Sequence, residues 1–104
     1  MPKRVLLGTK DLLFRSKLAG AVTASGGEVT PNEAACDLAV VEMELPGATD
    51  QIRELVARGI PVLAYGSHVR VDLLRAAREA GATAVPNSQV ERTLRVMVGA
   101  GLTP

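Results

Sequence analysis

The most informative part of the chain is Asp37-Leu38-Ala39-Val40-Val41-Glu42-Met43-Glu44-Leu45-Pro46-Gly47. Its four consecutive apolar residues, Leu38 to Val41, leave no polar face, which is typical of a strand buried on both sides in a parallel sheet. The run stops abruptly in acidic residues, Pro and Gly, so Glu42 is expected at the carboxyl end of the strand. Ligands of open parallel α/β sheets bind at that end, which makes Glu42 the main candidate for function.

Composition restricts the classes of protein that the chain can be. Its 104 residues fit one domain with a single core, spanning 1–104. Aromatic residues make up 2% and the net charge is +1, so we expect no nucleic-acid partner. No apolar run reaches about 18 residues and Met1 to Arg4 leads straight into a strand, so we expect no membrane span, no signal peptide and a cytoplasmic location. Cys36 is the only cysteine and is expected to be a buried thiol.

Hydrophobic periodicity predicts strands that alternate with helices. The expected elements are a strand at 4–8, a helix at 12–25, a weak strand at 28–30, the buried strand at 38–41, a helix at 49–58, a strand at 60–65, a helix at 69–80, a strand at 82–85, a helix at 89–98 and a tail at 99–104. Thr9, Ser67 and Ser88 are expected to cap the helices that follow them, Ser88 in a capping box with Glu91. These elements predict an α/β fold with three layers, a flavodoxin-like, doubly wound parallel sheet of five strands in the order 2-1-3-4-5.

One connection is shorter than this fold usually requires. Pro31 to Cys36 is all that joins the second expected strand to the central one. A parallel crossover normally takes about a dozen residues or more and usually contains a helix. We therefore expect the second helix to be a single turn or absent.

The chain resembles the CheY-like receiver domains of response regulators over most of its length. Asp37 to Gly47 is similar to the family segment D-L-x-x-x-D-x-x-L-P-G, and Pro61 to Ser67 to the family strand P-V-I-x-L-T-A. Ala77 to Ala82 resembles A-L-x-A-G-A, and Val5 to Leu18 follows the family order of apolar strand, acidic pair and Leu-rich helix. The resemblance implies the receiver fold and a role in signal transduction.

The phosphorylation site that the resemblance implies is incomplete here. Glu42 stands where the family has its phosphoacceptor Asp, and the acidic pair that holds Mg²⁺ falls on Thr9 and Lys10. An ammonium group in that place would repel the metal ion. The degenerate site consists of Thr9, Lys10, Asp11, Glu42, Gly66 at the family's switch position with Ser67 beside it, and Asn87 or Ser88 at the family's lysine position. We therefore expect no catalytic residues, no metal, no cofactor and no enzymatic activity, with residual Mg²⁺-dependent phosphotransfer at Glu42 or Asp11 as the enzymatic alternative.

Glu42 has three possible roles at this stage. It pairs with Lys10 across the strand ends as a fixed charge, or it is a solvated carboxylate, or it contacts a ligand. His68 has no second histidine or cysteine near it in the sequence, so we interpret it as a plain loop residue rather than a metal ligand. Adjacent Ser67 and His68 cannot easily present both side chains to one substrate atom, which argues against a hydrolase.

A charged surface completes the prediction. In receivers the side formed by the last two helices and the last strand often makes dimers through salt bridges. The corresponding cations here are Arg70, Arg75, Arg78, Arg92 and Arg95, with Asp72, Glu79 and Glu91 as potential partners. The sequence thus predicts a phosphorylation-independent, receiver-like signalling module that binds a protein partner or forms a homodimer. The alternative is a module that binds a small molecule or an anion in the cleft at the carboxyl ends of the strands, where Thr9 and Lys10 begin a helix.

Overall fold

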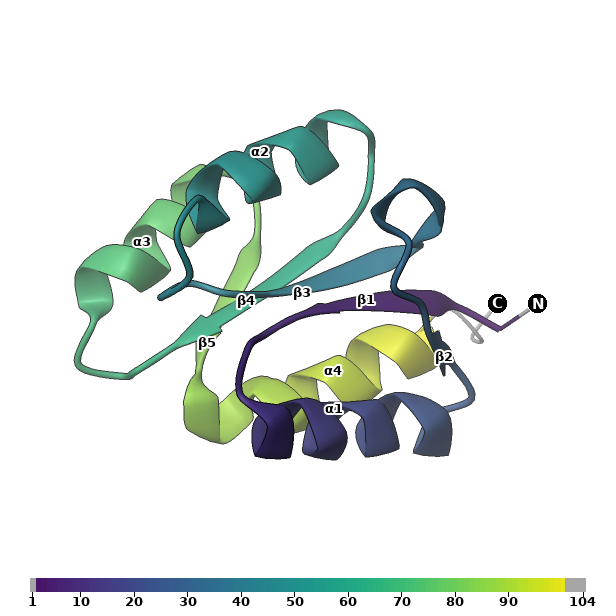
Figure 1. Ribbon diagram of the computed structural model, residues 1–104. Coiled ribbons are helices and arrows are strands. Elements are labelled where there is room, and N and C mark those ends of the chain that lie inside the picture. Colours follow the sequence, from purple (N-terminus) through teal and green to yellow (C-terminus); the bar gives the residue numbers. More distant parts are fainter. Residues whose placement is uncertain (1, 101–104) are drawn as a thin grey trace.

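The computed structural model describes residues 2–100. Within them, one parallel sheet has the order β2-β1-β3-β4-β5, and α1 and α4 lie on one face while α2 and α3 lie on the other (Figure 1). The strands are β1 (Arg4–Gly8), β2 (Glu28–Val29), β3 (Leu38–Glu42), β4 (Val62–Gly66) and β5 (Thr83–Pro86), and the helices are α1 (Leu12–Ala24), α2 (Ala48–Ala57), α3 (Val71–Glu79) and α4 (Val90–Ala100). The predicted three-layer flavodoxin-like fold is confirmed.

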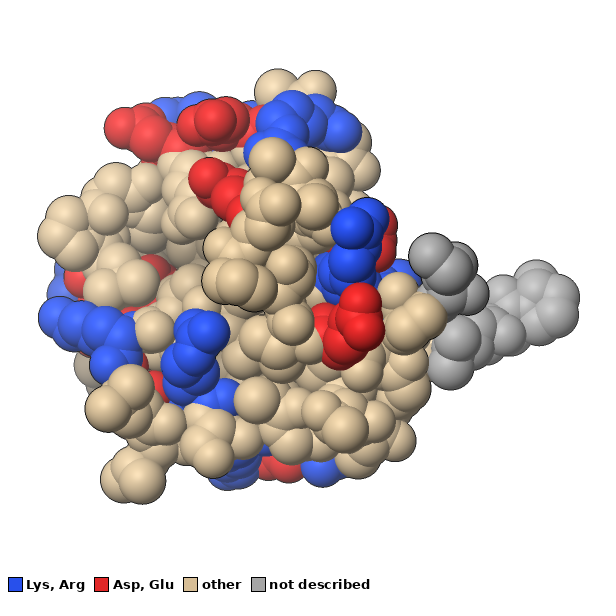
Figure 2. Space-filling model, turned by 45° about the vertical axis from the view of Figure 1, so that its right-hand side comes forward, with Lys and Arg blue, Asp and Glu red and all other residues tan. Residues whose placement is uncertain are grey.

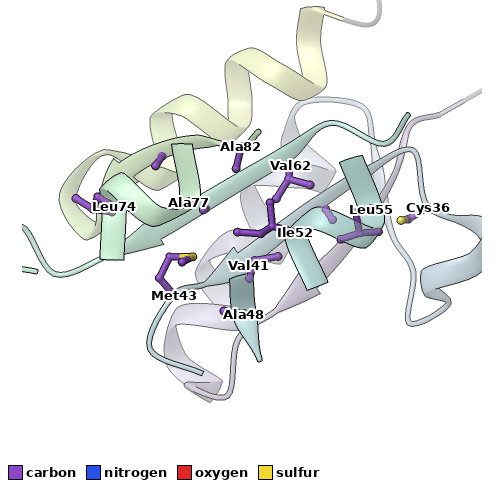
Figure 3. Packing of buried hydrophobic residues seen from close by; sticks show 13 residues of the cluster. Cys36, Val41, Met43, Ala48, Ile52, Leu55, Val62, Leu74, Ala77 and Ala82 are labelled. Carbon is purple, nitrogen blue, oxygen red and sulfur yellow. The ribbon is translucent and has the colours of Figure 1, made fainter. Parts of the chain in front are cut away.

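The central strand β3 explains why the core has two halves. Leu38 to Val41 are all buried, and alternate side chains of a strand point to opposite faces of the sheet. Val41 packs with Ile52 and Leu55 under α2 and α3 (Figure 3). Val40 packs with Leu18 and other residues under α1 and α4. A continuous apolar run is therefore what this position requires.

The shortened crossover is confirmed. Between β2 and β3 the chain forms only a 3-10 helix, η1 (Glu33–Ala35). Cys36 follows it and is 4% exposed, as expected for a buried thiol. Burial raises the pKa of this thiol above its usual value.

Two arginines satisfy backbone carbonyls near the two edges of the sheet. Strand β2 pairs with β1 only as far as Val5. Beyond that point Arg15 Nη1 donates to the carbonyl oxygen of Leu7 at 2.7 Å. In the same way Arg78 Nη2 donates to the carbonyl oxygen of Ala84 in β5 at 2.9 Å. Arg78 is therefore tied to its own sheet, although the sequence placed it on an interaction surface.

Two helix starts differ from the prediction. The N-cap of α1 is Asp11 and not Thr9, because Asp11 Oδ1 accepts the backbone N–H of Phe14 at 3.0 Å. Ser67 does not cap α3 either, since the helix begins later. Its Oγ accepts the backbone N–H of Val69 at 3.4 Å within the preceding loop. Both predictions failed because a second polar residue or an extra turn lies between the strand and the helix.

The expected capping box of the last helix is also wrong. Ser88 lies inside a 3-10 turn, η2 (Asn87–Gln89), which precedes α4. Glu91 does not turn back to Ser88, because its carboxylate pairs with Lys17 at 3.4 Å and with Arg95 at 3.1 Å. The first of these ion pairs joins α1 to α4.

The end of the chain was predicted as a tail from residue 99. Gly99 and Ala100 instead continue α4, while 101–104 lie outside the described residues. None of the helices in residues 2–100 combines the length and the apolar character needed to cross a membrane.

Candidate functional site

The candidate site lies where β1, β3 and β4 end side by side. The parallel register places Gly8 opposite Val41 and Glu42 opposite Tyr65. Gly8 lets β1 approach β3 closely, since a Cβ atom at this position would stand 2.9 Å from the carbonyl oxygen of Val40. The sheet itself therefore brings the residue after Gly8, which is Thr9, to the carboxylate of Glu42.

Glu42 is a half-buried carboxylate with three hydrogen-bond donors on one oxygen. Its Oε1 accepts the hydroxyl of Thr9 at 2.6 Å, the backbone N–H of Lys10 at 3.3 Å and the hydroxyl of Tyr65 at 3.4 Å. Within residues 2–100 no ion pair joins the ammonium of Lys10 to Glu42. The charge pair of Lys10 with Glu42, one of the three roles considered for Glu42, is therefore not formed. Lys10 contributes its backbone N–H, and the side-chain donor is Thr9.

Tyr65 is the functional candidate that sequence reasoning missed. It is 3% exposed, and its ring packs on Phe14 with 5.0 Å between ring centroids. Burial raises the pKa of the Tyr65 hydroxyl well above its usual value, and the nearby charge of Glu42 adds to this effect. Tyr65 is the fourth residue of β4, which begins at Val62. Its contact with Glu42 follows only from the register between β3 and β4, which the sequence does not reveal.

A pocket of about 230 Å³ opens beside Glu42. It is lined by Asp11, Phe14, Glu42, Glu44, Tyr65, Gly66 and Asn87. Four predicted site residues, Asp11, Glu42, Gly66 and Asn87, therefore meet there, while Thr9 supports Glu42 from the end of β1. Ser67 lines a neighbouring depression, and Lys10 and Ser88 line neither of them.

The charges of this pocket bear on the ligands it can take. Three carboxylates and no cation line it, so an anion would meet repulsion. The N-terminus of α1 is already occupied by the carboxylate of Asp11, which accepts the N–H of Phe14. The anion site considered for Thr9 and Lys10 is therefore disfavoured.

Among residues 2–100 no group of three His, Cys, Asp or Glu side chains could hold a metal ion. His68 lies exposed in the loop between β4 and α3.

Two of the five cations of the predicted arginine surface form ion pairs within the chain. Arg70 pairs with Asp72 at 3.2 Å, and Arg95 pairs with Glu91 at 3.1 Å. Arg75 and Arg92 are exposed. The ion pairs of Arg70 and Arg95 leave this surface with less unpaired charge than the sequence indicated. On the one face of the molecule that Figure 2 draws, cations and anions are interspersed.

Comparison with known proteins identifies the class of fold. Neither a protein-family model nor a curated protein sequence matches the chain. A CheY-like receiver domain protein from Methanospirillum hungatei is similar in structure, with a TM-score of 0.77, 18% identity and coverage of 98% of this chain and 94% of that one. The BeF3-activated receiver domain of DrrB, an OmpR/PhoB homologue of Thermotoga maritima, has a TM-score of 0.81 and 18% identity, with both chains fully covered.

A third similar structure belongs to a longer protein. NtrX from Brucella abortus, in complex with ADP, has a TM-score of 0.79 and 18% identity, and the match covers 98% of this chain but 27% of NtrX. The chain thus spans about a quarter of NtrX and the whole DrrB receiver domain. At these identities the likeness establishes the fold, which is that of response-regulator receiver domains.

Proposed function

We propose that this protein is a receiver-like signalling module that acts by binding another protein and does not depend on phosphorylation. The supporting observation is the hydrogen bond of 2.6 Å from Thr9 Oγ1 to Glu42 Oε1. By resemblance, an acidic residue that binds Mg²⁺ would stand in the place of Thr9. A neutral hydroxyl there donates a hydrogen bond to the carboxylate and removes one of the carboxylate ligands that Mg²⁺ would need.

The chemistry of phosphoryl transfer gives a second reason. Attack on a phosphoryl group depends on cations that neutralise its oxygens. Here the other charged groups that line the pocket beside Glu42 are the carboxylates of Asp11 and Glu44. They would repel a phosphodonor in the absence of a metal ion. Glu42 Oε1, the oxygen in contact with Thr9, also has its lone pairs engaged by hydrogen bonds.

The small-molecule alternative has weaker support. Pockets for drug-sized ligands usually measure about 300–1,000 Å³, whereas the pocket beside Glu42 measures about 230 Å³. Its acidic lining disfavours anions, which were one of the two ligand classes of this alternative. An absorbing or fluorescent compound that co-purifies with the protein would favour this alternative.

The deciding experiment is the thermal midpoint of the protein with and without Mg²⁺ and beryllofluoride, a mimic of the phosphoryl group. A ligand that binds only the folded state at about 100 times its Kd stabilises it by about 2.7 kcal/mol. For a domain of this size that corresponds to a rise of about 10 °C or more. We expect no shift. The DrrB receiver domain, which has a BeF3-activated form, is the positive control.

A rise in midpoint that requires both Mg²⁺ and beryllofluoride would contradict the proposal. It would mean that Glu42 and Asp11 form a working acidic site. The choice between a protein partner and a homodimer is tested separately, by measuring mass as a function of protein concentration. A mass that stays at one chain favours a different protein as partner.

A further inference from the structure

Large apolar side chains are exposed mainly at one edge of the molecule. Leu12 and Leu13, at the start of α1, are 79% and 85% exposed. Val69 and Val71, in the loop after β4 and at the start of α3, are 70% and 55% exposed. These two segments follow β1 and β4, so both lie at the carboxyl edge of the sheet. Exposed apolar side chains gathered at one edge are a feature of interaction sites in soluble proteins.

Two depressions lie between these segments. The first is the pocket beside Glu42, and Leu12 and Leu13 lie in the sequence between two of its lining residues, Asp11 and Phe14. The second, of about 430 Å³, is lined by Met43, Glu44, Ser67, Val69, Arg70 and Leu73. Glu44 lines both, so the two depressions are neighbours on the surface. We call the two depressions together, with Leu12 and Leu13 at one end, the edge groove.

The edge groove is negatively charged. Asp11, Glu42 and Glu44 contribute carboxylates to its lining. The one cation that lines it among the described residues is Arg70, whose guanidinium bonds both carboxylate oxygens of Asp72 at 3.2 and 3.3 Å. That cation is therefore neutralised by its own neighbour. Apolar side chains at both ends with acids between them match a ligand that is both apolar and basic.

We propose that the edge groove is the docking site for a basic, amphipathic segment of a partner protein. Leu- or Val-like side chains of that segment lie on Leu12, Leu13 and Val69, and an Arg or Lys side chain enters the pocket between Asp11 and Glu44. This inference rests on the proposed function and adds the place and the chemistry of the partner. The sequence placed the partner on the arginine surface, whereas this inference places it at the carboxyl edge of the sheet.

The test uses a pair of synthetic peptides of about 14 residues. One has Leu at helical spacing i, i+3, i+4 and i+7 with Arg at the other positions, and the second has Glu in place of every Arg. Binding to the full chain is measured by fluorescence anisotropy at low and at physiological salt. We expect the Arg peptide to bind at least about tenfold more tightly than the Glu peptide, with a difference that shrinks as salt screens the charges.

Matched variants locate the contact. Glu44→Lys should weaken binding of the Arg peptide about five- to tenfold, and Leu13→Ser should weaken it by a similar factor. Glu28→Lys makes the same charge change in β2 at the opposite edge, and Val96→Ser removes a comparably exposed apolar side chain from α4, so both should bind as the parent does. Peptide-induced chemical-shift changes in the backbone amides should gather on the loops after β1, β3 and β4.

Three results would overturn the inference. Equal binding of the Arg and Glu peptides would remove the charge argument. If Glu44→Lys and Glu28→Lys weakened binding of the Arg peptide equally, the peptide would be attracted by the net charge of the protein and not by a particular site. Self-association that is abolished by Leu13→Ser would make a second copy of this chain the occupant. None of these results changes the response to Mg²⁺ and beryllofluoride, so the proposed function stands or falls separately.

Discussion

Replacing Thr9 by Val tests how Glu42 is held. Valine keeps the shape of threonine but removes the hydroxyl that donates to Glu42 Oε1 at 2.6 Å. It also removes the acceptor of the Asp11 backbone N–H, which lies 3.3 Å from Thr9 Oγ1. Glu42 would keep two longer contacts, to Lys10 and to Tyr65. The substitution should therefore destabilise the fold without disrupting it.

The size of the effect follows from the burial of the carboxylate. A hydrogen bond to a charged group contributes about 1.5–3 kcal/mol to stability. Glu42 is half-buried, so water replaces part of what Thr9 gives, and we expect a loss of about 1 kcal/mol. This corresponds to a fall of about 4–8 °C in the thermal midpoint. Thr9→Ser, which keeps the hydroxyl, should stay within about 0.5 kcal/mol of the parent.

Tyr65 provides a fluorescence signal that reports on the site itself. The chain has one tyrosine and no tryptophan, and the hydroxyl of Tyr65 lies 3.4 Å from Glu42. Urea unfolding followed by tyrosine fluorescence and by circular dichroism gives the free energy of unfolding. A double-mutant cycle with Glu42→Ala should give a coupling of about 1 kcal/mol between Thr9 and Glu42. A coupling near zero, with Thr9→Val as stable as the parent, would refute this account of the site.

Two further predictions concern the same edge of the sheet. Asp11→Ala should cost about 1 kcal/mol of unfolding free energy, because it removes the side-chain cap of α1, and urea unfolding against an Asp11→Asn control, which keeps a capping oxygen, will measure it. The hydroxyl of Tyr65 has a raised pKa in the folded state, so its contribution to stability is complete below its ordinary pKa of 10.0 and is lost as the pH rises through the folded value. Phenolate absorbance should accordingly appear at higher pH in the folded chain than in urea, and coincident titrations would contradict this.

The fold was predictable because its signals are local. The run Leu38 to Val41 has no polar face, which is typical of a strand buried on both sides, and all four residues are buried. The six residues Pro31 to Cys36 were too few for a full crossover helix, and a single 3-10 turn is what forms. The hydrophobic pattern of a strand and the length of a connection can be read from the sequence. Both predictions could therefore be made without knowing which residues contact one another.

The details of the site depend on contacts, and these were harder to predict. The sequence placed Thr9, Lys10 and Glu42 at one edge, but it could not say which donor reaches the carboxylate. That depends on the register of β1 against β3 and on the direction of each side chain. Tyr65 was missed for the same reason, since it meets Glu42 only through the pairing of β3 with β4.

The length of the Glu42 side chain decides whether it can reach Thr9. An aspartate is shorter by one methylene group, or about 1.5 Å of chain. Without backbone movement, its oxygen would stand well beyond the 2.6 Å that separates Glu42 Oε1 from the Thr9 hydroxyl. Glutamate at this position and threonine at the end of β1 thus act as a pair. Ser67, the nearest hydroxyl to the family's switch position, bonds the backbone of Val69 and not Glu42. The loop that carries Val69 thus has a hydrogen bond of its own and makes none to Glu42 through Ser67.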